Sequence, residues 1–173
     1  LWPVAPTIAG AEQDLLQWLR AHTPKTAELT QQAEVKQAIR QTVVAQHSTK
    51  EHDLGFLRCE VIRETMRQAG DDPQRADEAY AVFHAARQRV TLYDGVEEAL
   101  TRLSAKYRLV AISNGTADVF ITPAAPYFHA AFKAHEVGVA KPDVKIYQLA
   151  TSLLALDANQ VLHVGDDART DVR

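Results

Sequence analysis

The first half of the chain alternates hydrophobic and polar residues with the period of an amphipathic helix. Leucine, isoleucine and valine recur there at intervals of three or four residues. Four such segments follow one another: residues 11–21, 30–47, 53–70 and 72–89. Thr30, Asp53 and Asp72 begin the last three, where a side-chain oxygen can accept a hydrogen bond from a first-turn amide. Four short-linked amphipathic helices predict a small helical bundle.

The second half, from about residue 90, alternates short apolar runs with helical segments. Helical patterns cover residues 94–106, begun by Asp94, and 143–154, and a short helix can follow Asn114-Gly115. Three apolar runs suit buried strands: residues 108–112, 132–137 and 161–164. Strands that alternate with helices predict an α/β fold with a doubly wound parallel sheet.

Composition narrows the class of protein further. Hydrophobic residues make up 46% of the 173 residues, which is enough for a real core. A formal net charge of −3 gives no reason to expect nucleic acid or a membrane surface as a partner. No apolar run approaches membrane-spanning length. The single cysteine, Cys59, rules out an internal disulfide and fits a cytoplasmic protein.

Polar turns follow all three expected strands. These turns are Ser113-Asn114-Gly115-Thr116, Gly138-Val139-Ala140-Lys141-Pro142-Asp143 and Gly165-Asp166-Asp167. Because ligands of open α/β sheets bind outside the carboxyl ends of the strands, we expect the turns to meet at one site. Hydroxyls and amides suit phosphate oxygens, lysine neutralises phosphate charge, and carboxylates hold Mg²⁺. The set predicts a site for a phosphoryl group with its metal.

Each turn also has a simpler interpretation. Asn-Gly at 114–115 is a common hairpin signal, Ser113 suits an ordinary turn, and Lys141 suits a solvated loop. The adjacent acids suit a solvated turn in which Asp167 or Thr170 caps the next helix. These alternatives stay open for each turn alone, and the three turns together favour the phosphoryl site.

The order of the three turns resembles motifs two, three and four of the haloacid dehalogenase superfamily of hydrolases. The matching stretches are an apolar strand followed by SNGT, then GVAKPDVKIYQLA, then VLHVGDDARTDV. The motifs match over residues 92–173, and the helical half matches only in general plan. The resemblance implies a Rossmann-like core over residues 91–173, an inserted all-helical cap over 9–90 and a connecting flap over 1–8.

The resemblance also implies a role for each matched residue. Phosphate binding would fall to four residues: Ser113, Asn114, Gly115 and Lys141. Lys141 would further act in catalysis by holding charge in the transition state. Asp166 would ligate Mg²⁺. Asp167, also catalytic, would pair with Lys141 or a metal-bound water, and Asp171 would orient that network.

Motif one of this family is an apolar strand ending DxDxT, often followed by leucine and an aromatic residue. The chain begins with Leu1 and Trp2, which is what should follow that motif. The resemblance therefore implies that the nucleophilic aspartate precedes Leu1, so no residue of this sequence is assigned to that role. We expect the complete protein to extend before Leu1 and beyond Arg173.

Substrate-facing residues of the cap are harder to choose. Arg58 could meet a second anionic group and Phe56 could stack on a ring, although we favour ordinary surface and core roles for both. His84 and His163 have no partners at metal-ligand spacing, so we expect them to be packing or strand residues.

The function implied is a Mg²⁺-dependent phosphatase that acts on a small phosphorylated metabolite through an aspartyl-phosphate, as a monomer or weak homodimer. The helical cap and the forms of motifs two and four most resemble a bacterial subgroup that includes a phosphatase of a flavin precursor. One alternative is a 2-haloacid dehalogenase, which needs no metal and typically lacks the paired acids. The other is a non-catalytic module, since the sequence contains no assigned nucleophile.

Overall fold

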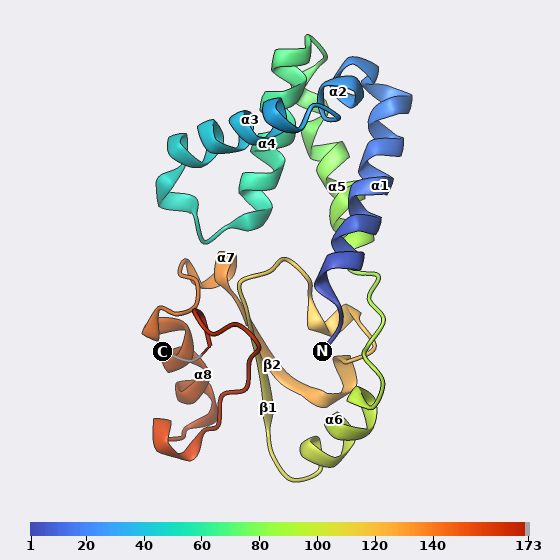
Figure 1. The fold of residues 1–173 in the computed structure, drawn as a ribbon. Coiled ribbons are helices and arrows are strands. Elements are labelled where there is room, and N and C mark those ends of the chain that lie inside the picture. Colours follow the sequence, from blue (N-terminus) through green and yellow to red (C-terminus); the bar gives the residue numbers. More distant parts are fainter. Residues whose placement is uncertain (172–173) are drawn as a thin grey trace. The chain divides into compact units, whose positions relative to one another are not determined.

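The computed structural model describes residues 1–171 of the chain (Figure 1). Its contacts divide the chain into two compact units, Leu1–Tyr93 and Asp94–Arg173. The first unit is helical, and the second combines helices with a parallel sheet. No helix within residues 1–171 is long and apolar enough to cross a membrane.

Five helices form the first unit. They are α1 (Val4–His22), α2 (Pro24–Leu29), α3 (Ala33–Gln46), α4 (Leu54–Ala69) and α5 (Ala76–Arg87), with short 3₁₀ turns at Ser48–Lys50 and Pro73–Arg75. Helix α1 packs on α5, and α4 packs on α5, α3 and α2. The expected bundle of amphipathic helices is confirmed, with α2 as an addition that the hydrophobic pattern did not predict.

Local capping signals set most of the helix ends. The Asp53 carboxylate accepts a hydrogen bond from the Phe56 amide at 2.9 Å, and Gly70 ends α4 with a left-handed φ of 75°. The expectation that Thr30 begins the next helix was wrong. Thr30 ends α2, and its hydroxyl donates to the Ala27 carbonyl at 2.8 Å, which removes it from a capping role.

The expected flap over residues 1–8 is largely helical, because α1 begins at Val4. Pro6 does not prevent this. It lies in the first turn, where backbone N–H groups have no partner within the helix, so proline removes no hydrogen bond there.

Two apolar clusters form the core of the helical unit. The larger joins α1, α4 and α5 around Leu19, Met66 and Phe83, and the smaller joins α3 and α4 around Ile39 and Leu57. Met66 is fully buried. The helical stripes predicted from the sequence are therefore the surfaces that the helices bury against one another.

Within residues 94–171 the second unit contains two parallel strands. Its elements are α6 (Val96–Ser104), β1 (Leu109–Ser113), β2 (Phe128–Lys133), α7 (Ala134–Val137) and α8 (Val144–Leu154), with 3₁₀ turns at Val119–Ile121, Ala125–Tyr127 and Ala158–Gln160. Leu109 pairs with Phe128 and Ser113 with Lys133. Helix α8 packs on β1, and Figure 1 shows how α6, β1 and β2 follow one another. The fold class is the predicted Rossmann-like α/β arrangement.

Two expectations for this unit were wrong in detail. The second strand ends at Lys133, opposite the last residue of β1, and residues 134–137 form α7 rather than strand. Helix α6 has Gly95 at its N-cap in a left-handed conformation (φ 79°), so Asp94 does not cap it. The turn after β1 passes through bends at residues 114–116, where the Gly115 amide donates to the Ser113 hydroxyl, and the short 3₁₀ helix Val119–Ile121 then follows, as the sequence suggested.

The third expected strand, residues 161–164, is also absent from the part of the chain that the structure describes. Leu162 and Val164 are 87% and 82% exposed. A strand needs a neighbour to pair its N–H and C=O groups, and within residues 1–171 the sheet contains only β1 and β2. An apolar run in the sequence indicates that a segment tends to be buried, but it does not show which strand would pair with that segment.

Candidate active site

The first two polar turns are joined by the side chain of Asn114. Its Oδ1 accepts a hydrogen bond from the Lys141 amide at 2.7 Å, and its Nδ2 donates to the Lys141 carbonyl at 3.0 Å. This double contact fixes the backbone of Lys141 beside the end of β1. Ser113 accepts the Gly115 amide at 2.9 Å, as in an ordinary turn, and its hydroxyl keeps its own proton for donation to a ligand.

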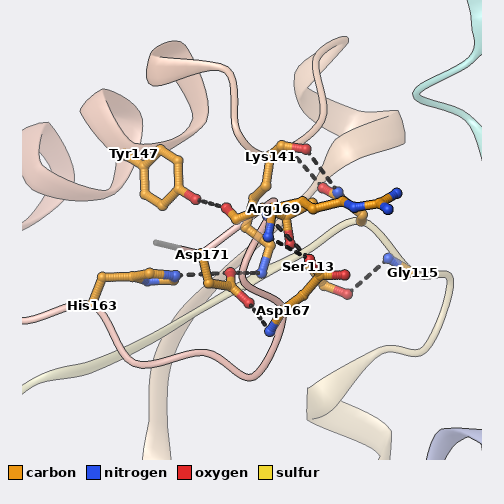
Figure 2. Close-up of polar contacts among 10 residues, drawn as sticks. Ser113, Gly115, Lys141, Tyr147, His163, Asp167, Arg169 and Asp171 are labelled. Atoms are coloured by element: carbon orange, nitrogen blue, oxygen red, sulfur yellow. Dashed lines mark hydrogen bonds and ion pairs between the residues drawn. The ribbon is translucent and has the colours of Figure 1, made fainter. Parts of the chain in front are cut away.

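An ion pair joins the second turn to Asp171, which lies four residues after Asp167 of the third turn and binds its amide. Lys141 Nζ lies 2.6 Å from Asp171 Oδ1, and the two side chains are only 12% and 3% exposed. Figure 2 shows both side chains converging, with His163 reaching the same carboxylate from the other side. The three turns that the sequence placed at one edge of the sheet therefore do meet.

The Asp171 carboxylate is held on both oxygens. Oδ1 also contacts His163 Nε2 at 2.9 Å, and Oδ2 accepts the Asp167 amide at 3.1 Å. Burial raises the pKa of Asp171, but the hydrogen bonds from Lys141, His163 and the Asp167 amide outweigh it and lower the pKa to about 2. Asp171 is therefore an anion at neutral pH.

Gly165 makes room for this carboxylate. A Cβ atom at position 165 would lie 2.1 Å from Asp171 Cγ, a distance that no real contact reaches. The backbone of Gly165 is not in a left-handed conformation, so the requirement for glycine is one of space alone. The glycine before the paired acids is explained by the third acid, which packs against it.

Asp167 has a different position from the one expected. Its Oδ1 accepts the amides of Arg169 at 2.8 Å and Thr170 at 3.2 Å, as in the simpler capping interpretation. Lys141 pairs with Asp171 instead of Asp167. Because its carboxylate binds the turn amides, Asp167 orders the loop that carries Asp166 and Asp171.

Asp166 is the acid best suited to a cation. Its side chain is exposed, and among residues 1–171 its carboxylate has no hydrogen-bond or ion-pair partner. No cluster of three or more metal-ligating side chains exists within the same residues. Mg²⁺ nevertheless usually takes one or two carboxylates together with waters and substrate phosphate. The unpaired oxygens of Asp166 fit that mode of binding.

Sequence reasoning missed Tyr147 and underestimated His163. The Tyr147 hydroxyl donates to the Thr170 carbonyl at 2.6 Å, and its ring meets the His163 ring edge-on with centroids 5.1 Å apart. Tyr147 lies within the motif-three stretch, but nothing local signals a contact with residues 16 or more positions away. His163 was expected to be a packing or strand residue, and it is a polar partner of Asp171.

The two cap candidates are engaged within the helical unit. The Arg58 guanidinium pairs with Glu12 and lies 4.3 Å from the centroid of the Phe83 ring. Phe56 packs edge-on against His47 at 5.0 Å. Arg58 also borders a mainly apolar cavity of about 240 Å³ between α1, α2, α3 and α4, which contains none of the motif residues. These contacts favour packing roles for both residues.

Comparison with known proteins identifies the family. The sequence model of the haloacid dehalogenase-like hydrolases matches residues 3–173, so the chain belongs to this family. The resemblance found in the three polar turns is thereby confirmed.

Two curated relatives and one solved structure are similar over much of the chain. The 5-amino-6-(5-phospho-D-ribitylamino)uracil phosphatase YigB of Escherichia coli K12 is 32% identical over 99% of this chain and 73% of its own length. Phosphoserine phosphatase of Thermus thermophilus is 30% identical over 69% of this chain and 50% of its own length. A crystal structure of 2-haloacid dehalogenase from Pseudomonas syringae pv. Tomato DC3000 superimposes with a TM-score of 0.92 at 33% identity, over 99% of this chain and 76% of that one.

Proposed function

We propose that the complete protein is a Mg²⁺-dependent phosphomonoesterase that acts on a small phosphorylated metabolite. The observation that carries this proposal is the nearly buried Lys141–Asp171 ion pair, tied to the Ser113 turn through Asn114. The loop that carries Asp171 also carries Asp166, whose carboxylate has no partner among residues 1–171. A cation, a hydroxyl donor and a free carboxylate together suit a phosphoryl group and its metal. Two curated relatives that bear phosphatase names support the same reaction.

The residues of this chain would mainly position the substrate and stabilise charge. Asp171 holds the Lys141 side chain in place, so that its ammonium can neutralise the phosphoryl oxygens as charge moves onto the leaving group. The Ser113 hydroxyl would donate to a further phosphoryl oxygen. Asp166 would hold Mg²⁺, which when bound supplies additional positive charge at the phosphoryl group.

The proposed chemistry has two transfers. An aspartate carboxylate attacks phosphorus and expels the alcohol, and water then hydrolyses the aspartyl-phosphate to release inorganic phosphate. We assign this nucleophile to none of residues 1–171. The helical unit would act as a cap that excludes water and selects the substrate. The first substrate to test is the phosphorylated flavin precursor named for the Escherichia coli relative.

A 2-haloacid dehalogenase is the second candidate, because the similar crystal structure bears that name. Asp166 separates the two functions, since the dehalogenase reaction requires no metal. The complete protein should be assayed with an aryl phosphate and with 2-chloropropionate, each with Mg²⁺ and with EDTA. Phosphate release that EDTA abolishes supports our proposal. Halide release in EDTA without phosphate release supports the dehalogenase, and the lack of both reactions supports a non-catalytic module.

A further inference from the structure

We propose that His163 is a positioning residue that holds the Asp171 carboxylate in the orientation that Lys141 requires. His163 Nε2 lies 2.9 Å and Lys141 Nζ 2.6 Å from the same oxygen, Asp171 Oδ1 (Figure 2). The effect on catalysis rests on the proposed phosphatase function. The hydrogen bond itself does not.

The carboxylate depends on donors from several directions. Oδ2 binds only the Asp167 amide among residues 1–171, and Gly165, which packs against the carboxyl carbon, has no side chain that could donate to it. Lys141 has a long, flexible side chain, which constrains Asp171 weakly by itself. The imidazole of His163 is rigid, so it supplies the constraint on Oδ1 that the lysine lacks.

His163 is itself held in place by Tyr147 of α8. The two rings meet edge-on, and the Tyr147 hydroxyl binds the carbonyl of Thr170, the residue before Asp171. Helix α8 begins three residues after Lys141. A closed circuit of contacts thus runs from Lys141 through α8 to Tyr147, on to His163 and Asp171, and back to Lys141. Removing the His163 hydrogen bond would open this circuit at the carboxylate.

The contact with Asp171 determines that Nε2 is a ring nitrogen of His163 that carries a proton. An ionised carboxylate can only accept hydrogen bonds, so Nε2 of His163 must carry a proton whether the ring is neutral or charged. This requirement can be tested in wild-type protein without metal or substrate. Nitrogen-15 NMR of the metal-free complete protein should show His163 protonated at Nε2, with the signal assigned by its loss in His163→Gln.

Two substitutions separate the hydrogen bond from ring packing. His163→Phe keeps a ring against Tyr147 but cannot donate to Asp171, whereas His163→Gln restores an N–H near the position of Nε2. We expect His163→Phe to lower kcat with the aryl phosphate about tenfold to a hundredfold with KM changed less than about threefold. His163→Gln should recover most of that loss. His129→Phe is the matched control, because His129 is exposed on β2 and its side chain forms no polar contact among the described residues.

Several results would overturn the proposal. A wild-type His163 with bare Nε2 would exclude the hydrogen bond even if His163→Phe failed to fold. Folded His163→Phe with kcat within about twofold of the wild type would exclude a positioning role. Equal losses in His163→Phe and His163→Gln would mean that the imidazole ring matters and the donated bond does not. If the wild type hydrolyses no phosphate ester, the proposed function fails while the NMR result still decides the hydrogen bond.

Discussion

The two units of the molecule differ in how far the charged side chains of their ion pairs are exposed to water. In the helical unit ion pairs lie largely at the surface, as with Arg75 and Glu78, which are 31% and 60% exposed. In the α/β unit Lys141 and Asp171 are almost withdrawn from water, while the apolar Leu162 and Val164 are exposed. Apart from Arg87 of α5, which is buried and whose Nη1 has no hydrogen-bond partner among the described residues, the helical unit follows the usual distribution of polar and apolar groups. The loops of the α/β unit invert that distribution.

This difference indicates where the chemistry lies. An exposed ion pair contributes about 0 to 1 kcal/mol, whereas withdrawing a pair from water costs several kcal/mol per ion before attraction offsets it. A nearly buried ion pair in a loop that also carries a carboxylate without a partner among residues 1–171 is typical of a functional site. We therefore expect substitutions in the α/β loops to change activity and substitutions in the helical core to change stability.

The largest effect should follow the loss of Lys141. Lys141→Ala should lower kcat/KM with an aryl phosphate about a hundredfold to a thousandfold, since a preorganised charge at a developing anion contributes roughly 3 to 4 kcal/mol. Lys141→Arg should restore little activity, because the planar guanidinium of arginine is a poor replacement for the compact ammonium of lysine. The control is Lys145→Ala on the exposed side of α8, which should be nearly silent. Activity in Lys141→Ala above a third of the wild type would refute the assignment.

In the helical unit, the loss of a core side chain should lower the free energy of unfolding by about as much as the loss of Lys141 raises the activation free energy. Met66 is fully buried between helices, so Met66→Ala should lower the free energy of unfolding by about 2 to 5 kcal/mol in urea titrations. Met66→Leu, which conserves volume, should cost less than about 1.5 kcal/mol. Below the melting transition kcat should stay close to the wild-type value. A fall of kcat in folded Met66→Ala would contradict the expectation that substitutions in the helical core change stability but not activity.

A glycine-to-alanine change should lower activity in the α/β unit and raise stability in the helical unit. Gly165→Ala should displace Asp171 and lower kcat/KM at least about tenfold, since small misplacements in an active site are costly. Gly10→Ala in α1 meets no atom within 4 Å and should raise stability by about 0.5 to 1 kcal/mol. Paired melts and kinetics of both variants check this. Wild-type kinetics in Gly165→Ala would show that the loop can accommodate the side chain.

A smaller effect should appear at acid pH. The pKa of Asp171 is lowered from 3.8 to about 2 in the folded protein, so its carboxylate stabilises the fold above pH 3.8, and this contribution is lost as pH falls towards 2. Asp171→Asn should thus be less stable than wild type at neutral pH, by a margin that shrinks between pH 4 and pH 2. Urea midpoints measured across that range test this, and a constant margin would contradict it.

Signals close together in sequence predicted most of the fold. Asp53 and Gly70 delimit α4 as expected, and β1 lies within one residue of its predicted position. The third strand was predicted wrongly because an apolar run at 161–164 indicates burial but not a pairing partner. The missed helix α2 is only six residues long, too short for its hydrophobic period to be distinctive.

The motif residues of the candidate site could be predicted from the sequence, whereas Tyr147, the role of His163 and the contacts among the side chains could not. The parallel strands β1 and β2 bring Asn114 and Lys141 to one edge of the sheet, as the order of elements implied. Asp171 was expected there because of a third strand that the described residues do not form, and it reaches Lys141 from a loop. Which acid pairs with Lys141 depends on side-chain directions in the loop, and Asp167 turns to cap that loop instead. The partnership of Tyr147 with His163 spans 16 positions without periodicity, so no pattern in the sequence announces it.

The central claim is that the α/β loops hold a phosphoryl group and a divalent cation, and Asp166 tests it most directly. The measurement is Mg²⁺-dependent hydrolysis of an aryl phosphate by the complete wild-type protein, Asp166→Asn and Asp167→Asn, with thermal melts. We predict that wild-type activity requires Mg²⁺, that Asp166→Asn abolishes it in a folded protein, and that Asp167→Asn loses less. Metal-independent hydrolysis by the wild type, or full activity in Asp166→Asn, would contradict the account.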